Sequence, residues 1–249
     1  MVCDGVSALY IFSLGPLPIT NTLLNTLLID IIILALAFVL TRNIKIIPGF
    51  LQNGAEFVIG GLYNFTKSIA GDRTPQIFPY FITFFIFILL ANWSGLIPGM
   101  TTIGLEKGHG HVIPFLRSAT TDLNTTLALA LVSLAATHIM SIKTLGVKEY
   151  ISRFISLNPI LLFVGALEIV SEITKIISLS FRLFGNIFAG EVVLETVSGI
   201  FSFLFPLPFL GLEFIVGAVQ ALVFSMLTLA FMVILTTPHH EEAKEEVSH

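Results

Sequence analysis

The longest apolar stretch of the chain decides its fold, and residues 159–199 read PILLFVGALEIVSEITKIISLSFRLFGNIFAGEVVLETVSG. No proline occurs between Pro159 and Pro206, so no residue there blocks a continuous helix. At 1.5 Å per residue, a helix of about 40 residues is roughly 60 Å long, about twice the thickness of the bilayer core. The stretch therefore predicts a long, steeply tilted membrane helix. The alternative is a break near Gly185 and Asn186, which gives two short spans and reverses the side of the tail.

The composition fits a membrane protein and no soluble class. Of the 249 residues, 55% are hydrophobic and only 11% are charged, and the mean hydropathy is +0.95. Soluble domains carry about 25% charged residues, so this chain has less than half the usual share. The composition excludes a soluble globular domain, a disordered chain and a nucleic-acid binder. The single cysteine, Cys3, excludes a disulfide scaffold and a cysteine-based metal cluster.

The apolar stretches together predict an all-α polytopic membrane protein with a single membrane domain. Each is close to or above the ~20 residues that cross a bilayer. The five predicted membrane helices are residues 23–40, 77–97, 119–142, 159–199 and 209–236. We expect the second and third to form a hairpin. We expect the last two to form a long, steeply tilted hairpin joined at Pro206 and Pro208.

Residues 50–70 have a different pattern. Apolar residues such as Val58, Leu62 and Phe65 recur at intervals of three and four, and polar residues such as Glu56 lie between them. This spacing predicts an amphipathic helix that lies on the membrane surface. The alternative is a loop with scattered apolar residues.

The basic residues between the predicted helices indicate the orientation of the chain. Loops and tail on one side of the membrane carry eight Lys and Arg residues, and those on the other side carry two. Because basic loops remain on the inner side, we expect the N-terminus outside and the C-terminus inside. The tail, residues 237–249, is acidic and is expected to be solvated.

Seven charged residues lie within the last two predicted helices. Each costs about 2.5–3.5 kcal/mol at the centre of a membrane helix, so such groups usually face a partner or a water-filled path for ions. They are Glu168, Glu172, Lys175, Arg182, Glu191, Glu195 and Glu213.

The spacing of these charges predicts two polar paths with a positive gate between them. Glu172 can pair with Lys175 across one turn. Arg182 has no carboxylate three or four residues away on its own helix, and its guanidinium stays charged. Glu191 lies nine residues beyond Arg182, about 13.5 Å along the axis, and Glu168 lies on the other side of it.

The last two predicted helices also share polar groups. Glu213 and Gln220 are seven residues apart and therefore share a helix face. In an antiparallel hairpin, Glu213 lies toward the same outer surface as Glu191. Gly190 is one of several small residues that let another helix approach closely, and ordinary packing is an equally good interpretation of them.

Three motifs resemble one known family. Residues 180–191, SFRLFGNIFAGE, resemble the signature of subunit a of F-type ATP synthases, the stator half of their ion channel. Residues 122–131, DLNTTLALAL, and residues 220–224, QALVF, resemble the motifs of an earlier helix and of the last helix in that family. The order and spacing agree over nearly the whole chain.

The resemblance implies a rotary mechanism and a set of partners. The expected partners are a ring of c subunits, peripheral-stalk b subunits, the lipid bilayer and, indirectly, the F1 catalytic sector, with no nucleic acid. The expected location is an energy-transducing membrane, with a bacterial inner membrane favoured over an organellar inner or thylakoid membrane. The chain itself is expected to have no catalytic site, cofactor or metal, because it contains no nucleotide-binding motif.

The resemblance also implies roles for individual residues. Arg182 matches the essential arginine that faces the ring carboxylate. The outer access path is matched by Asn186, Glu191, Glu213 and Gln220. Glu168 matches a carboxylate of the inner path, with Glu172 and Lys175 on the same stripe, and Asp122 matches a polar position without an assigned path.

The outer path departs from the family pattern. Many members have a histidine and an acid where this chain has Glu191 and Glu213, and two neighbouring carboxylates can still share a proton. His138 is a candidate substitute for the missing histidine. The favoured interpretation of His138 is a residue at a helix end near the inner interface.

Two other function classes stay open from the residues alone. An independent secondary ion transporter would also need intramembrane charges, but such folds usually contain repeats and broken helices, which this sequence lacks. An intramembrane enzyme would need a recognisable catalytic motif. The pair His239 and His240 lacks the spacing of a metalloprotease motif.

Overall fold

The computed structural model describes residues 10–14, 17–42, 44–97, 104–106, 112–114, 117–154, 159–200 and 206–237. Within them, five helices are long and apolar enough to cross a membrane, which confirms the all-α polytopic class. The elements in order are β1 (Tyr10–Leu14), β2 (Leu17–Thr20), α1 (Asn21–Arg42), α2 (Phe50–Ala70), the 3-10 helix η1 (Gly71–Arg73), α3 (Thr74–Ser94), β3 (Gly104–Glu106), β4 (Val112–Pro114), the 3-10 helix η2 (Ala119–Thr121), α4 (Leu123–Leu145), α5 (Val147–Phe154), α6 (Pro159–Ile200) and α7 (Pro206–Thr236).

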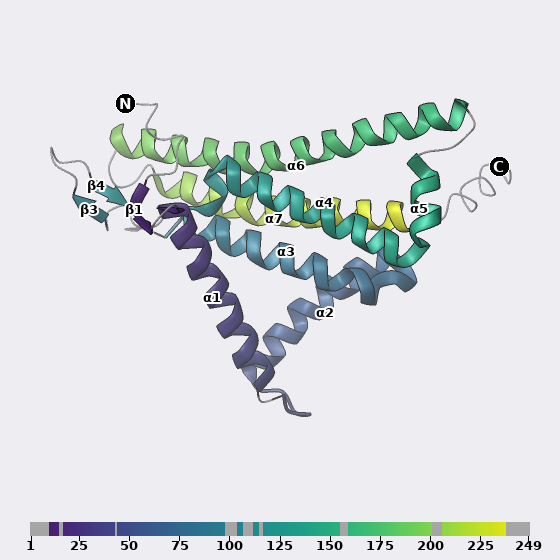
Figure 1. The fold of residues 1–249 in the computed structure, drawn as a ribbon. Coiled ribbons are helices and arrows are strands. Elements are labelled where there is room, and N and C mark those ends of the chain that lie inside the picture. Colours follow the sequence, from purple (N-terminus) through teal and green to yellow (C-terminus); the bar gives the residue numbers. More distant parts are fainter. Residues whose placement is uncertain are drawn as a thin grey trace.

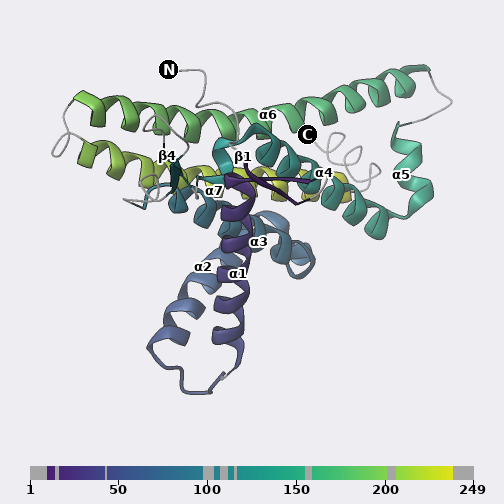
Figure 2. The same ribbon diagram turned by 60° about the vertical axis from the view of Figure 1, so that its left-hand side comes forward.

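Four helices form a bundle, and two others project from it as a wedge. Figure 1 shows α3, α4, α6 and α7 running beside one another, and the same four pack together in the core. Helices α1 and α2 leave this bundle and meet at a tip, where residues 44–49 connect them (Figure 2). The N-terminal half of α1 is held by the body, since Ile29 is buried against Ala91 and Ala119.

The core of the bundle consists of two apolar clusters. One contains Leu183 and Ile187 from α6 together with Phe84, Ile88, Ala130, Leu179, Ala221 and Phe224. The other joins the end of α2 to α3, α4 and α7 and contains Ala70, Ile77, Phe81, Met140, Leu229 and Met232. In water, burial of a large apolar side chain contributes about 1.5–3 kcal/mol to stability. Lipid is itself apolar, so close packing between the side chains decides how these helices associate.

Helix α6 is continuous from Pro159 to Ile200. The alternative break near Gly185 and Asn186 is therefore wrong, because both residues stay within the helix. Helix α7 begins at Pro206, earlier than the predicted residue 209, since proline is well suited to the first turn, where its missing N–H is not needed. The tilt of this hairpin in a bilayer stays a prediction.

Residues 50–70 form helix α2, so the alternative loop is wrong. Thr66 and Ala70, at the C-terminal end of α2, are buried against the bundle. Phe50 and Phe57, nearer the tip of the wedge, are exposed. This exposure is compatible with the predicted position on a membrane surface, which stays a prediction.

Some boundaries and short elements differ from those predicted. The third membrane helix starts at Leu123 rather than residue 119, because residues 119–121 form η2 and Asp122 caps the helix by accepting the N–H of Asn124 at 2.9 Å. Helix α3 starts at Thr74 rather than residue 77, with a proline in its first turn. The sequence did not predict α5 or the two short hairpins β1–β2 and β3–β4.

The end of α7 is anchored beside η1. Arg73 donates from Nη1 to Thr236 Oγ1 at 2.8 Å, and Ser141 Oγ donates to the carbonyl of Leu235 at 2.7 Å. These contacts hold the last turn of α7 against η1 and α4. The predicted acidic tail lies outside the described residues beyond Thr237.

Candidate functional site

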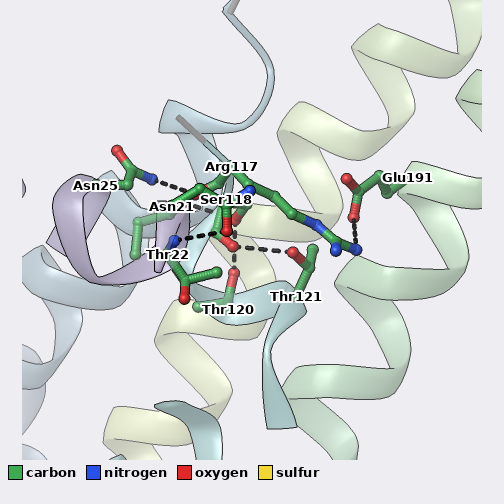
Figure 3. Close-up of polar contacts among 9 residues, drawn as sticks. Asn21, Thr22, Asn25, Arg117, Ser118, Thr120, Thr121 and Glu191 are labelled. Carbon is green, nitrogen blue, oxygen red and sulfur yellow. Dashed lines mark hydrogen bonds and ion pairs between the residues drawn. The ribbon is translucent and has the colours of Figure 1, made fainter. Parts of the chain in front are cut away.

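Glu191, near one end of α6, forms an ion pair with Arg117. Nη2 of Arg117 lies 3.2 Å from Oε2 of Glu191, and their side chains are 10% and 34% exposed. Figure 3 shows Arg117 reaching from the segment before η2 toward α6. The charge of Glu191 is therefore balanced by a residue 74 positions away in the sequence.

Glu213 on α7 faces Gly190, the residue beside Glu191. A Cβ atom placed on Gly190 would lie 2.6 Å from Oε1 of Glu213 and 2.7 Å from its Cδ. Glu213 is buried, and its Oε2 accepts no hydrogen bond from the described part of the chain. Glycine at position 190 thus makes room for a carboxylate at the helix contact, next to the Glu191–Arg117 pair. We call Arg117, Glu191 and Glu213 the outer-end cluster, after the side of the membrane that the sequence predicts for this end of α6.

A network of buried polar side chains supports Arg117. Its backbone carbonyl accepts a hydrogen bond from Asn25 Nδ2 at 2.8 Å, and the same nitrogen lies 2.8 Å from Ser94 Oγ. Ser118 Oγ donates to the carbonyl of Ala91 at 3.0 Å. These bonds tie the segment before η2 to α1 and α3 (Figure 3). The position of Arg117 is therefore fixed by contacts of its segment with two helices.

Asp122 lies at the edge of this network and has a structural role there. Its Oδ1 accepts the N–H of Asn124, and its Oδ2 accepts a hydrogen bond from Thr22 Oγ1 at 3.3 Å. Oδ1 therefore caps α4, and Oδ2 joins the start of α4 to α1. The ion-translocation role that the sequence predicted for Asp122 stays untested.

Arg182 lies near the middle of α6 on an exposed face. Its Nη2 donates to Ser178 Oγ at 3.2 Å, one turn away on the same helix. It makes no ion pair with a carboxylate of the described residues. The guanidinium stays protonated at any physiological pH, so this positive charge remains for another chain or water to balance.

Asn186, one turn from Arg182, connects α6 to α7. Its Nδ2 donates to Oε1 of Gln220 at 2.8 Å. Gln220 and Glu213 therefore both face α6, as their sequence spacing predicted. This contact and that of Gly190 with Glu213 confirm that α6 and α7 are antiparallel neighbours.

A second cluster lies on α6 on the other side of Arg182. Lys175 Nζ donates to Oε1 of Glu172 at 2.8 Å, which confirms the predicted pair. His138 Nε2 on α4 lies 3.7 Å from Oε2 of Glu172, and His138 Nδ1 is hydrogen-bonded to the hydroxyl of Tyr150 on α5 at 3.0 Å. We call Glu172, Lys175, His138 and Tyr150 the inner-end cluster.

Comparisons with known proteins show the family of this chain. A family model described as the ATP synthase A chain matches residues 23–233. ATP synthase subunit a of Moorella thermoacetica is 36% identical over 222 residues, which are 89% of this chain and 93% of the relative. The subunit a of Legionella pneumophila is 33% identical over 230 residues, 92% of each chain. ATP synthase subunit a 3 of Pelobacter propionicus is 34% identical over 210 residues, 83% of each.

The chain belongs to the ATP synthase subunit a family. It is thus a multi-pass membrane protein and the proton-translocating stator subunit of an ATP synthase. It is the non-catalytic membrane-sector subunit, so it works in a complex with other subunits. The resemblance seen in residues 180–191 is confirmed.

The structure of this subunit a corrects one interpretation of His138. His138 was a candidate substitute for a histidine beside Glu191 and Glu213. It lies instead in the inner-end cluster, against Glu172. His138 lies two turns before the end of α4 and away from Glu191 and Glu213, so among the described residues the outer-end cluster contains carboxylates and an arginine without this histidine.

Two residues of subunit a that the sequence did not single out belong to these clusters. Arg117 entered only as a loop charge, although two carboxylates near one helix end already required a cation there. Tyr150 lies on α5, which the sequence did not predict. Glu168 and Glu195 lie further along α6 toward its two ends, Glu168 partly buried and Glu195 exposed.

Proposed function

We propose that this chain carries protons between two half-channels and a ring of c subunits. A proton enters from the outer side at Glu191 and Glu213 and passes Asn186 and Gln220. It neutralises a carboxylate on the ring, which then turns away through lipid. After nearly a full turn, the carboxylate releases its proton into the inner half-channel near Glu168.

One observation carries this proposal. Arg182 is exposed on α6 without a carboxylate partner among the described residues, and carboxylates lie along α6 on both sides of it. Arginine cannot relay protons, because it does not lose its own. It can hold an incoming carboxylate in the ionised form and so prevent direct leakage between the half-channels.

The energetics agree with such a gate. The transmembrane potential supplies about 2.3 kcal/mol per charge per 100 mV. A direct proton leak past Arg182 would dissipate that free energy without rotation. A permanent positive charge between the paths repels a proton, whereas the protonated, neutral carboxyl group of the ring passes into lipid.

The proposal assigns surfaces to the partners. We assign the exposed face of α6 around Arg182 to the c ring and the exposed wedge of α1 and α2 to the peripheral-stalk b subunits and lipid. F1 acts on the chain only indirectly, through the rotor and the stalk. We place the complex in a bacterial inner membrane, with the N-terminus outside and the C-terminus inside, in keeping with the bacterial relatives and the basic loops.

A cross-linking experiment tests the position of the ring. In a complex whose Cys3→Ser chain is otherwise free of cysteine, Phe181→Cys is combined with a cysteine beside the ring carboxylate. We expect oxidation to give a disulfide between the two subunits, because Phe181 is 55% exposed next to Arg182.

The matched control is Leu36→Cys on the wedge, where Leu36 is 48% exposed and also lies within a predicted membrane helix. We expect no cross-link to the ring from this position. An assembled complex without a cross-link from Phe181→Cys, or with equal yields from both positions, would contradict the proposed ring surface.

A further inference from the structure

The inner-end cluster contains a buried carboxylate with one oxygen already paired and one still available. Glu172 is only 7% exposed. Its Oε1 is paired with Lys175 at 2.8 Å, whereas its Oε2 accepts no hydrogen bond from the described residues. Lys175 is itself held in place, since its Nζ lies 4.7 Å from the ring centre of Phe231 on α7. The available oxygen therefore belongs to a carboxylate with a fixed position.

His138 is the group that faces this oxygen. Its Nε2 lies 3.7 Å from Oε2 of Glu172, which is longer than a hydrogen bond. A small rotation of the glutamate side chain is enough to bring the two atoms within hydrogen-bond distance. Imidazole is the side chain whose unperturbed protonation changes nearest to neutral pH, so it can both accept and release a proton under working conditions.

The other nitrogen of His138 leads toward the end of the molecule. Nδ1 is hydrogen-bonded to the Tyr150 hydroxyl at 3.0 Å, and the ring of Tyr150 lies edge-on to the imidazole. Tyr150 is on α5, a short helix that packs on α4 and α6 and whose residues 147–149 are exposed. A phenol hydroxyl can donate and accept at once. The three side chains thus form a continuous row from the interior of α6 to an exposed helix.

We propose that His138 is a proton carrier of the exit path, with Glu172 as its donor and the Tyr150 hydroxyl as its acceptor. This inference rests on the proposed function and names the side chains that carry the proton out of the inner half-channel. A proton on Oε2 of Glu172 moves to Nε2 of His138, which leaves a carboxylate and an imidazolium. The imidazolium then gives its Nδ1 proton to the Tyr150 oxygen while the hydroxyl proton of Tyr150 passes to water. The proton from Glu172 then remains on Nε2, and the relay resets when a flip of the imidazole ring turns the protonated nitrogen back toward Tyr150.

The direct test replaces His138 in the complete complex, reconstituted in vesicles. His138→Gln keeps a polar side chain of similar reach but cannot carry a proton. We expect the rate of proton-driven ATP synthesis to fall about tenfold or more, since positioned proton transfer groups typically contribute at least about 100-fold. Added imidazole should restore part of the rate, because it replaces the missing carrier. Tyr150→Phe should give a smaller loss that imidazole does not restore.

Two controls make the outcome decisive. Ser133 lies on α4, the helix of His138, and Ser133→Ala removes a buried hydrogen bond of 2.7 Å to Thr228 on α7. Any loss of rate it causes should not respond to imidazole. A His138→Gln complex that assembles and keeps its full rate, or loses rate without rescue by imidazole, overturns the relay. The Arg182→Ala complex is measured alongside. If Arg182→Ala retains coupled transport, the proposed function fails. If Arg182→Ala loses coupled transport while His138→Gln keeps its full rate, only the relay is rejected.

Discussion

Replacing Arg182 with alanine is expected to abolish both ATP-driven proton pumping and proton-driven ATP synthesis, while the membrane sector still conducts protons passively. Without the guanidinium, no permanent charge lies between the outer-end and inner-end clusters. Protons can then pass between them directly, and the ring carboxylate has no cation that favours its ionised form. The measurement is the pumping rate and the passive proton conductance of the reconstituted complex.

Two matched variants separate the charge from the fold. Arg182→Lys keeps a positive charge but loses the planar guanidinium, so we expect low passive conductance together with a reduced coupled rate. Ser178→Ala removes only the hydrogen-bond partner of Arg182 on an exposed surface, and we expect little change. Full ATP-driven pumping in an assembled Arg182→Ala complex would contradict the gate.

Gly190→Ala is expected to reduce coupled transport strongly without unfolding the chain. The new Cβ would lie 2.6 Å from Oε1 of Glu213, closer than such atoms can approach, so the buried carboxylate must move. Alanine is the better helix former by about 1 kcal/mol, so the backbone of α6 is not the weak point. A displacement of about 1 Å at a reacting group can reduce a rate about 100-fold, and we expect a loss between about tenfold and 100-fold in pumping rate.

Gly185 on the same helix provides the control for Gly190. A Cβ added at Gly185 meets no atom within 4 Å, so Gly185→Ala should pump normally. Combining Gly190→Ala with Glu213→Asp shortens the acidic side chain and should recover part of the rate. Equal rates for Gly190→Ala and Gly185→Ala would show that the Gly190–Glu213 contact has no role in transport.

The helices could be predicted from the sequence because their signals are local. The continuity of α6 follows from a run without proline. The start of α7 was predicted three residues late, because Pro206 and Pro208 were assigned to the connection between the helices. The short helix α5 and the two hairpins were not predicted. These elements have eight residues or fewer, so they contain no long apolar run that would indicate them. The start of α4 was wrong by four residues because the buried residues Ala119–Thr121 form a separate 3-10 helix directly before the cap at Asp122.

The candidate site was predicted only where its contacts are local in sequence. The Glu172–Lys175 pair is one turn apart, so helix periodicity predicted it. The Arg117–Glu191 pair joins the segment before η2 to α6, and the His138–Glu172 pair joins α4 to α6, so no single-helix periodicity relates these positions. Helix packing brings them together, and for His138 it selects one of the two interpretations that the sequence left open.

The central claim is that the two half-channels end on opposite sides of Arg182, and side-specific thiol labelling tests it most directly. Asn186→Cys and Ser178→Cys, each one turn from Arg182 on α6, are made separately in the Cys3→Ser chain of the assembled complex. We predict that a membrane-impermeant thiol reagent labels Asn186→Cys only from the outer side and Ser178→Cys only from the inner side. Labelling of both positions from the same side would contradict the claim.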